Sequence, residues 1–376
     1  MASTTTSRPT MGNVMVIGGT GFLGHHIVNM LVHHYQTESI SVIDLRTSRN
    51  QRPDSDSVRY LEADITDASR LLSIFDETCP DVVIHTASPP PQATVATTRE
   101  MFKKVNIDGT RCVVETCQKK NIKALVYTSS ASIVSDNKSD LINIDERWPV
   151  ISGAKQPEYY VETKAKAEEL ILSANRQGPH KLLTAAIRPS GIVGEGDTMV
   201  TYHIMNIYRE GKTGVQVGKN DNLFDFTYVE NVAYAHLLAA KALLLTAESG
   251  NVPLDHDRVD GEAFFITNDS PIYFWDFARA IWAAAGSPHG TEHVWILPRD
   301  VGLVLGLLSE VFFAIIRKPP TFNRQRIVYS CMTRYYNISK AKKRLGYKPL
   351  VSLDEGVRRT VKWFLAQEKN EGAMAR

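Results

Sequence analysis

The residues best suited to chemistry are Tyr160 and Lys164, which stand four positions apart. On a helix that spacing places both side chains on one face, with the ammonium close to the phenol. A phenol has a pKa of about 10 and is a poor base at neutral pH, and a nearby cation lowers that pKa. The pair therefore predicts proton transfer with an alcohol. Tyr160 is preferred to Tyr159, because the residue four positions after Tyr159 is Thr163.

Ser130, thirty residues before Tyr160, follows a predicted strand over residues 124–128. Ligands of open α/β sheets bind beyond the carboxyl ends of the strands, so this hydroxyl is placed to hydrogen-bond a substrate oxygen as charge develops on it. A tyrosine and a lysine at this spacing also occur by chance on helices that only pack. The catalytic interpretation depends on their combination with Ser130 and with a glycine-rich turn near the N-terminus.

That turn lies between Val14 and Gly24 and reads Val-Met-Val-Ile-Gly-Gly-Thr-Gly-Phe-Leu-Gly. Four apolar residues open it and predict a buried strand, and a helical pattern follows over residues 25–34. Gly18 permits the tight turn, Gly21 lets the backbone approach a pyrophosphate, and Gly24 lets the helix pack on the strand. The helix N-terminus would then hold the diphosphate. The alternative is a plain strand-to-helix turn.

An acidic residue follows each of the next two predicted strands. Residues 39–43 form a strand that ends at Asp44, where a carboxylate can bond both hydroxyls of an adenosine ribose and repels a 2′-phosphate. NAD is therefore favoured over NADP, although the positive charge of Arg46 would weaken that repulsion. The alternative interpretation is that Asp44 is only a capping or surface residue. Asp64, after a strand over 59–62, is placed to accept from the adenine amino group.

The following elements complete the predicted frame around a cofactor. A strand over 82–85 ends in small residues, including Ala87, that leave room for the cofactor. Prolines then predict a loop over 89–99 that moves over the substrate. Another loop is predicted over residues 135–156. We further expect helices over 105–119, from near Glu158, over 229–245 and over 274–285, and a strand over 262–267; His236 is expected to be a core residue.

The composition argues against several classes of function. The chain has 376 residues, 43% of them hydrophobic, which is enough for a large core in one or two domains. Its net charge is +2, with no basic block, which argues against nucleic acid as a partner. The four cysteines lack metal-ligand spacing, so no metal site is predicted and reduced thiols facing the cytosol are expected. Residues 1–12 predict a disordered tail and no signal peptide.

With these motifs the chain resembles the extended short-chain dehydrogenase/reductase family. The resemblance rests on the glycine turn, Ser129-Ser130, Tyr160 to Lys164, and Arg188-Pro-Ser-Gly-Ile-Val-Gly194. It implies an α/β fold, a Rossmann-type doubly wound parallel sheet with a smaller C-terminal substrate-binding domain, and a catalytic set of Ser130, Tyr160 and Lys164. The residues expected to contact NAD are Gly18, Thr20, Gly21, Phe22, Leu23, Gly24, Asp44, Asp64, Ile65, Ala87, Tyr160, Lys164, Pro189 and Gly191.

Later motifs are more specific. The stretches 224–232, 263–269 and 335–350 are similar to those of the 3β-hydroxysteroid dehydrogenase family, and most of all to its sterol-4α-carboxylate 3-dehydrogenases (decarboxylating). The similarity runs from about residue 13 to about residue 364, with Tyr159 as a departure at the pocket edge. It implies NAD-dependent oxidation of the 3β-hydroxyl of a 4α-carboxysterol, or a related triterpenoid, to the 3-ketone with loss of the C4 carboxylate.

Two other functions stay open at this stage. A nucleotide-sugar epimerase or dehydratase would have the same fold, but the steroid-type motifs and an apolar segment at 301–316 argue against it. A non-catalytic NAD-binding protein would have no use for an activated phenol. We expect a dinucleotide domain over residues 13–190, to which 224–267 return, and a substrate-binding part made of 191–223 and 268–376.

The apolar segment 301–316 has two interpretations. It is shorter than the roughly twenty residues of a membrane-spanning helix and contains Glu310, so it is either a buried helix lining the substrate pocket or a monotopic anchor flanked by Arg317 and Lys318. The resemblance favours the anchor and implies a location on the cytosolic face of the endoplasmic reticulum membrane, with the cytoplasm as the alternative. The resemblance is also compatible with a homodimer or with association with other sterol-demethylation enzymes.

Overall fold

The structure is a computed structural model that describes residues 8–90, 98–316, 318, 320 and 322–374, with side chains as far as residue 369. Parts of three predictions lie outside the described residues: the first seven positions of the tail, positions 91–97 of the proline-rich loop, and Arg317 beside the apolar segment.

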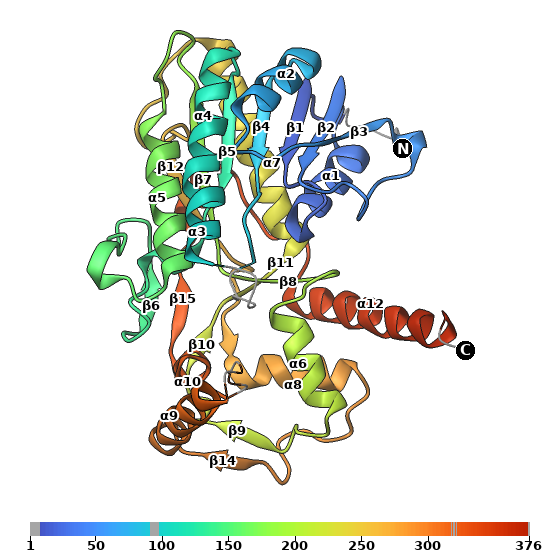
Figure 1. Cartoon of the computed structure of the whole chain (residues 1–376), viewed down its shortest axis with the longest axis vertical. Coiled ribbons are helices and arrows are strands. Elements are labelled where there is room, and N and C mark those ends of the chain that lie inside the picture. Colours follow the sequence, from blue (N-terminus) through green and yellow to red (C-terminus); the bar gives the residue numbers. More distant parts are fainter. Residues whose placement is uncertain (1–7, 91–97, 317, 319, 321, 375–376) are drawn as a thin grey trace, which may run out of the picture.

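The larger half is built on a seven-stranded parallel sheet in the order β12-β7-β5-β4-β1-β2-β3 (Figure 1). Its strands are buried apolar runs that are covered on both faces, as expected of a parallel sheet. Successive side chains of β1 enter opposite cores, with Val14 and Val16 on one face and Met15 and Ile17 on the other. The strands are β1 Asn13–Ile17, β2 Ser39–Asp44, β3 Val58–Glu62, β4 Val82–His85, β5 Ala124–Thr128, β7 Leu183–Pro189 and β12 Glu262–Ile266.

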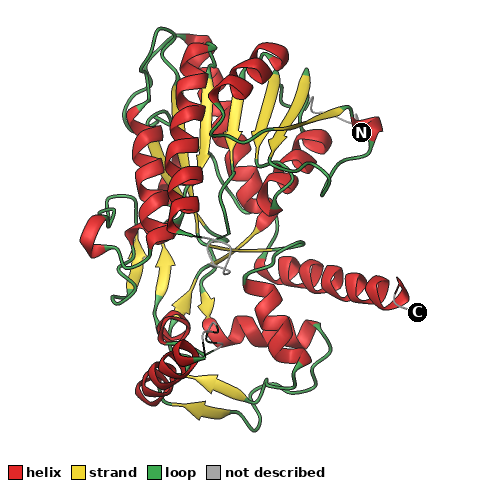
Figure 2. Cartoon of the chain, viewed as in Figure 1, coloured by secondary structure: helices red, strands yellow, loops and turns green. Residues whose placement is uncertain are grey.

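Helices cover both faces of this sheet, as Figure 2 shows in red around the yellow strands. On one face lie α1 Phe22–His34 and α7 Val229–Ser249. On the other lie α2 Ala68–Thr78, α4 Thr110–Lys119 and α5 Tyr159–Ser173. The predicted doubly wound, Rossmann-type α/β fold is thus confirmed.

The smaller half gathers short strands and helices around an aromatic core, in which Phe226 stacks on Phe277 at 3.7 Å between ring centroids. One small sheet has the order β13-β10-β15-β6, and two further pairs join β8 to β11 and β9 to β14. The strands are β6 Leu141–Ile144, β8 Gly191–Val193, β9 Val215–Val217, β10 Leu223–Phe224, β11 Phe226–Tyr228, β13 Ile272–Tyr273, β14 Trp295–Leu297 and β15 Arg334–Tyr336. The helices are α6 Val200–Arg209, α8 Phe274–Ala284, α9 Arg299–Ile315, α10 Arg324–Cys331 and α12 Leu353–Met374, and α11 Ser339–Arg344 lies between α10 and α12 in the chain.

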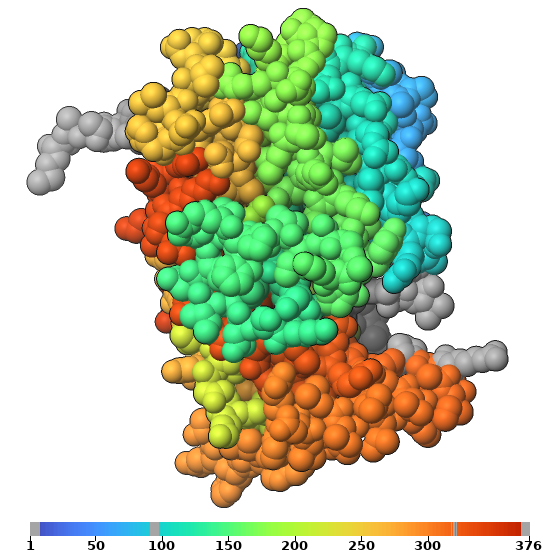
Figure 3. Space-filling view, turned by 90° about the vertical axis from the view of Figure 1, so that its left-hand side faces the viewer, coloured from blue at the N-terminus to red at the C-terminus, as the bar shows by residue number. Residues whose placement is uncertain are grey.

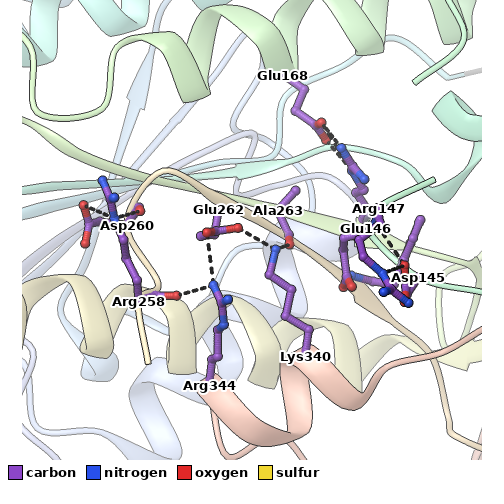
Figure 4. Close-up of polar contacts among 12 residues, drawn as sticks. Asp145, Glu146, Arg147, Glu168, Arg258, Asp260, Glu262, Ala263, Lys340 and Arg344 are labelled. Atoms are coloured by element: carbon purple, nitrogen blue, oxygen red, sulfur yellow. Dashed lines mark hydrogen bonds and ion pairs between the residues drawn. The ribbon is translucent and has the colours of Figure 1, made fainter. Parts of the chain in front are cut away.

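The domain borders differ from those expected. The strand β6 lies inside the segment predicted as a loop, and it pairs with β15 of the smaller half. Of the returning segment, α7 and β12 join the large sheet, whereas β10 and β11 lie in the small ones. Helix α11 packs on the large half, where Lys340 and Arg344 both reach Glu262 of β12 (Figure 4).

Two local predictions also need correction. The tail expected over residues 1–12 is too long, because Thr10 pairs with Gln36 and Met11 is buried in the core. The helix expected from Val105 begins earlier, with α3 Arg99–Phe102, and continues through a π-helical turn, Lys103–Gly109, into α4. A wide turn of this kind inside a helix often marks a functional site.

Candidate active site

The glycine turn between β1 and α1 is shaped to receive a diphosphate. Gly18 has φ +81°, and a Cβ on Gly24 would lie 2.1 Å from the carbonyl oxygen of Gly18. Helix α1 begins after Gly21, with no side-chain cap and no acidic residue in its first turn. Its first N–H groups are therefore available to an anion, which fits the cofactor predicted for this position. Phe22 and Leu23 form this first turn.

Asp44 ends β2 beside the glycine turn. Its Oδ2 accepts from the amide of Thr20 at 3.2 Å and from the Thr20 hydroxyl at 2.7 Å, and its Oδ1 accepts from the Leu45 amide at 2.8 Å. The carboxylate is thereby fixed in direction while acceptor positions stay available for ribose hydroxyls.

The other residues that the sequence predicts to contact the cofactor are Asp64, Ile65, Ala87, Pro189 and Gly191. Asp64 is occupied by the Thr66 hydroxyl and by an ion pair with Lys104 at 3.1 Å. Ala87 lies against Gly18: a Cβ added to Gly18 would be 2.7 Å from the backbone nitrogen of Ala87. Ile65 is buried, Pro189 ends β7 and Gly191 begins β8.

The three predicted catalytic residues come from β5 and α5. Ser130 follows β5 and begins a 3₁₀ turn over Ala131–Val134, where its Oγ accepts from the amide of Ser132 at 3.1 Å. Tyr160 lies in the first turn of α5, half-buried, with its ring against Phe102. The carboxyl end of β5 and the start of α5 lie at the end of the large sheet that faces the smaller half (Figure 1).

Lys164 lies one turn further along α5 and is 2% exposed. Its ammonium donates to the carbonyl oxygen of Thr128 and lies 4.3 Å from the ring centroid of Tyr127. Burial lowers the pKa of Lys164 to about 7. Burial raises the pKa of Tyr160 to about 12, against a lowering by the Ser88 hydroxyl. The expected lowering of that pKa by Lys164 is not seen in this geometry, because the ammonium is directed at Thr128.

A buried polar layer behind these residues holds them in place. His236 accepts from the Thr128 hydroxyl at 2.8 Å and bonds the Val232 carbonyl through its other ring nitrogen. Burial lowers the pKa of His236 to about 4, so the ring is neutral at physiological pH. The expectation that His236 is a core residue rather than a catalyst is confirmed.

Asn106 and His85 are further polar groups at the site to which the sequence analysis gave no role. Asn106 lies in the π-helical turn, is 1% exposed and donates to the Thr163 hydroxyl at 2.9 Å, while its carbonyl oxygen has no partner among the described residues. His85 ends β4, contacts Thr110, and burial lowers its pKa to about 3. For Asn106 the sequence did contain a signal: an asparagine inside a predicted helix has low helix propensity, which indicates a role other than helix formation.

Comparisons with known proteins identify the family of this chain. The sequence profile of the 3-beta hydroxysteroid dehydrogenase/isomerase family matches residues 15–299. The chain belongs to this family. Among family relatives, the sterol-4-alpha-carboxylate 3-dehydrogenase (decarboxylating) of Schizosaccharomyces pombe is 41% identical over 96% of this chain and 99% of its own. The mouse protein of the same description is 37% identical over 93% and 90% of the two chains.

Solved structures share the fold. The UDP-glucose 4-epimerase of Thermotoga maritima matches with a TM-score of 0.67 at 21% identity, covering 95% of this chain and all of its own. At that identity the likeness concerns the fold alone. In the part of the chain that the structure describes, no group of three or more His, Cys, Asp or Glu residues is arranged to hold a metal ion.

The apolar segment forms helix α9, at the end of the molecule furthest from the large sheet (Figure 1). Its buried residues are two glycines, and a Cβ on Gly306 would lie 2.9 Å from Ile327 of α10. Most of the larger apolar side chains are exposed, while Leu303 packs on the core of the smaller half, and this contradicts the interpretation as a buried helix lining the pocket. The exposed residues of this face, with those of the neighbouring strand pair, are Val215, Trp295, Ile296, Val301, Val304, Leu305, Leu307, Leu308, Val311, Phe312, Ile315 and Ile316. Among the described helices, none is long and apolar enough to span a bilayer.

Proposed function

We propose that this family member is an NAD-dependent dehydrogenase that oxidises the 3β-hydroxyl of a 4α-carboxysterol, or a related triterpenoid, to the 3-ketone with accompanying loss of the C4 carboxylate, in sterol or triterpenoid biosynthesis. The observation that carries the proposal is the match with decarboxylating sterol dehydrogenases over almost the whole length of a chain in which Ser130 follows β5 and Tyr160 and Lys164 lie in the first turns of α5.

In this reaction the ionised form of Tyr160, the phenolate, would accept the proton of the substrate hydroxyl, and the Ser130 hydroxyl would hydrogen-bond the same oxygen as its charge changes. Bound NAD supplies the hydride acceptor. Lys164, buried one turn further along α5, would hold the nicotinamide ribose if its ammonium turned from the Thr128 carbonyl, and its charge would then favour the ionised form of the phenol. The 3-keto-4-carboxylate is a β-keto acid that loses carbon dioxide by itself, so no separate residue is assigned to that step.

The choice of NAD rather than NADP rests on Asp44. Its carboxylate is held toward the glycine turn by Thr20, where a 2′-phosphate would bring a second negative charge against it. The backbone oxygen of Arg46 accepts from the Thr20 hydroxyl, so this loop is tied to the same network.

We infer that the exposed face of α9 and of the strand pair β9 and β14 rests on a membrane surface. Twelve large apolar side chains are exposed there, among them Trp295 at 61% and Ile315 at 75%. Figure 3 shows this orange segment along one end of the molecule. A contiguous apolar face with a tryptophan is typical of a monotopic contact with lipid, and a sterol substrate is itself dissolved in lipid. We further propose the cytosolic face of the endoplasmic reticulum membrane as the location, because the resemblance to the sterol dehydrogenases implies it.

The test is reduction of NAD and of NADP by the purified protein with a 4α-carboxy-3β-hydroxysterol, with the product analysed by mass. NADH together with a 3-ketone lighter by one carbon dioxide is the expected result. A folded, NAD-binding protein that is inactive on carboxylated sterols and triterpenoids contradicts the proposal. Turnover of a UDP-sugar would assign the epimerase function instead.

A further inference from the structure

The smaller half buries an arginine that has no acidic partner. Arg334, the first residue of β15, is 4% exposed. The described residues include one other buried arginine, Arg188, which forms an ion pair with Glu168 at 2.5 Å. Arg334 forms no ion pair with any described residue. A buried charge without a counter-charge is costly, so its presence points to an anion that the protein itself does not supply.

The groups around the guanidinium are neutral. Its Nε donates to the Tyr336 hydroxyl at 2.7 Å and its Nη2 to the Ser132 hydroxyl at 2.9 Å. The rings of Phe224, Tyr329 and Tyr336 lie 5.7–6.0 Å from its central carbon and compensate the charge in part. Nη1 has no hydrogen-bond partner among the described residues and keeps some contact with solvent. Nη1 of the Arg334 guanidinium is therefore free to donate a hydrogen bond to a ligand.

Arg334 is fixed to the turn that carries Ser130. Ser132 accepts from Arg334, and its own amide donates to the Ser130 hydroxyl. The Tyr336 hydroxyl, held by Arg334, donates in turn to the carbonyl of Ala131. The guanidinium on β15 is thus linked through Ser132 to the proposed oxygen-binding hydroxyl of Ser130 by two hydrogen bonds.

The acidic group that influences Arg334 from outside is Glu158, the residue before α5, which also interacts electrostatically with Tyr160. Its carboxylate accepts from Asn137 and, at 2.6 Å, from Gln325, and it makes no ion pair with Arg334. Glu158 therefore acts electrostatically on both Arg334 and Tyr160 without forming an ion pair with the arginine.

Resting on the function proposed above, we propose that Arg334 binds the 4α-carboxylate of the substrate. The hydroxyl and the carboxylate are borne by adjacent carbons, so a substrate held through its hydroxyl by Ser130 and Tyr160 brings the carboxylate to the neighbouring side of the same turn. A guanidinium binds a carboxylate through paired hydrogen bonds, and the substrate supplies the missing negative charge. Arg334 is then the residue that distinguishes carboxylated from neutral 3β-hydroxysterols.

The experiment compares the wild type with Arg334→Met on two substrates, a 4α-carboxy-3β-hydroxysterol and its 4α-methyl counterpart. We expect kcat/KM for the carboxylated sterol to fall about 100-fold, mainly through KM, because a charged hydrogen bond is lost. The value for the methyl sterol should change little. Arg334→Lys should recover part of the loss, and Arg147→Met, at a surface arginine paired with Asp145, is the matched control.

Equal losses on both substrates, or no loss on either, would overturn the role of Arg334, because a structural arginine does not discriminate between them. A wild type that binds NAD but oxidises neither sterol contradicts the proposed function instead. In that case, equilibrium binding of the carboxylated sterol to the wild type and to Arg334→Met still decides whether Arg334 holds the carboxylate. If Arg334→Met does not fold, Arg334→Lys and the methyl ester of the substrate on the wild type give the same decision: a methyl ester that binds as well as the acid overturns the proposal.

Discussion

The two halves of the molecule satisfy their buried charges in opposite ways. In the larger half, Arg188 is paired with Glu168, and Lys164 donates to a backbone carbonyl. In the smaller half, Arg334 is buried among neutral groups, and α9 turns its apolar side chains outward. The larger half therefore holds a fixed geometry for a cofactor that all its relatives could share. The smaller half leaves the charge of Arg334 without an acidic partner among the described residues and the apolar face of α9 uncovered, so both need a partner from outside the chain.

The largest effect is expected where the larger half performs chemistry. Tyr160→Phe keeps the ring against Phe102 but removes the hydroxyl. We expect kcat to fall about a thousandfold or more, because proton transfer loses its acceptor, while NAD binding is retained. Stopped-flow or steady-state NADH formation with parallel calorimetry of NAD binding measures both. Near-normal turnover would remove Tyr160 from the mechanism.

The glycine turn tests how fixed the cofactor geometry is. In Gly24→Val the new Cβ would stand 2.1 Å from the Gly18 carbonyl, so the turn must move. NAD affinity should fall about 100-fold, which corresponds to roughly 2.7 kcal/mol. Gly290→Ala is the control, since a Cβ there meets nothing within 4 Å. Unchanged NAD affinity in Gly24→Val would contradict the position assigned to the diphosphate.

The buried polar layer predicts a pH dependence of stability. The folded pKa of His236 is lowered to about 4 from 6.5 by burial, so the unfolded chain takes up a proton that the folded chain excludes. Stability is therefore lost as pH falls from about 6.5 toward 4, by about 2 kcal/mol at pH 5 for this residue. Urea unfolding at pH 7.5 and 5.0 should show that difference reduced in His236→Gln and unchanged in His289→Gln, which alters an exposed histidine. An equal difference in both variants would contradict the neutral ring.

The smallest effect is expected at the apolar face of the smaller half. Leu308→Glu with Ile315→Glu places two charges on exposed positions of α9. Binding to liposomes of neutral and anionic phospholipid should weaken about tenfold or more, because two charged side chains no longer enter the lipid interface. Val252→Glu with Leu254→Glu, also at exposed apolar positions, is the matched control. Equal liposome binding by both double variants would contradict the inference that α9 contacts the membrane.

The parts of the fold that follow local rules were predictable. The strand β5 has the predicted bounds, and β2 differs by one residue, because buried parallel strands are uninterrupted apolar runs. The strand β6 was missed because it has only four residues, two of them exposed, and it is stabilised by β15 from far along the chain. Asn106 and His85 were left without a role for the same reason, since their partners Thr163 and Thr110 come from other turns and elements.

The sequence by itself determined the glycine turn, the acidic end of β2, and the spacing of Tyr160 and Lys164, because each is a short-range pattern of backbone freedom and helix periodicity. Only the tertiary structure decided that Arg334 is buried without an acid and that α9 packs through its glycines and exposes its larger side chains. The physical reason is that burial and charge compensation depend on which distant segments meet, and a linear pattern does not contain that information.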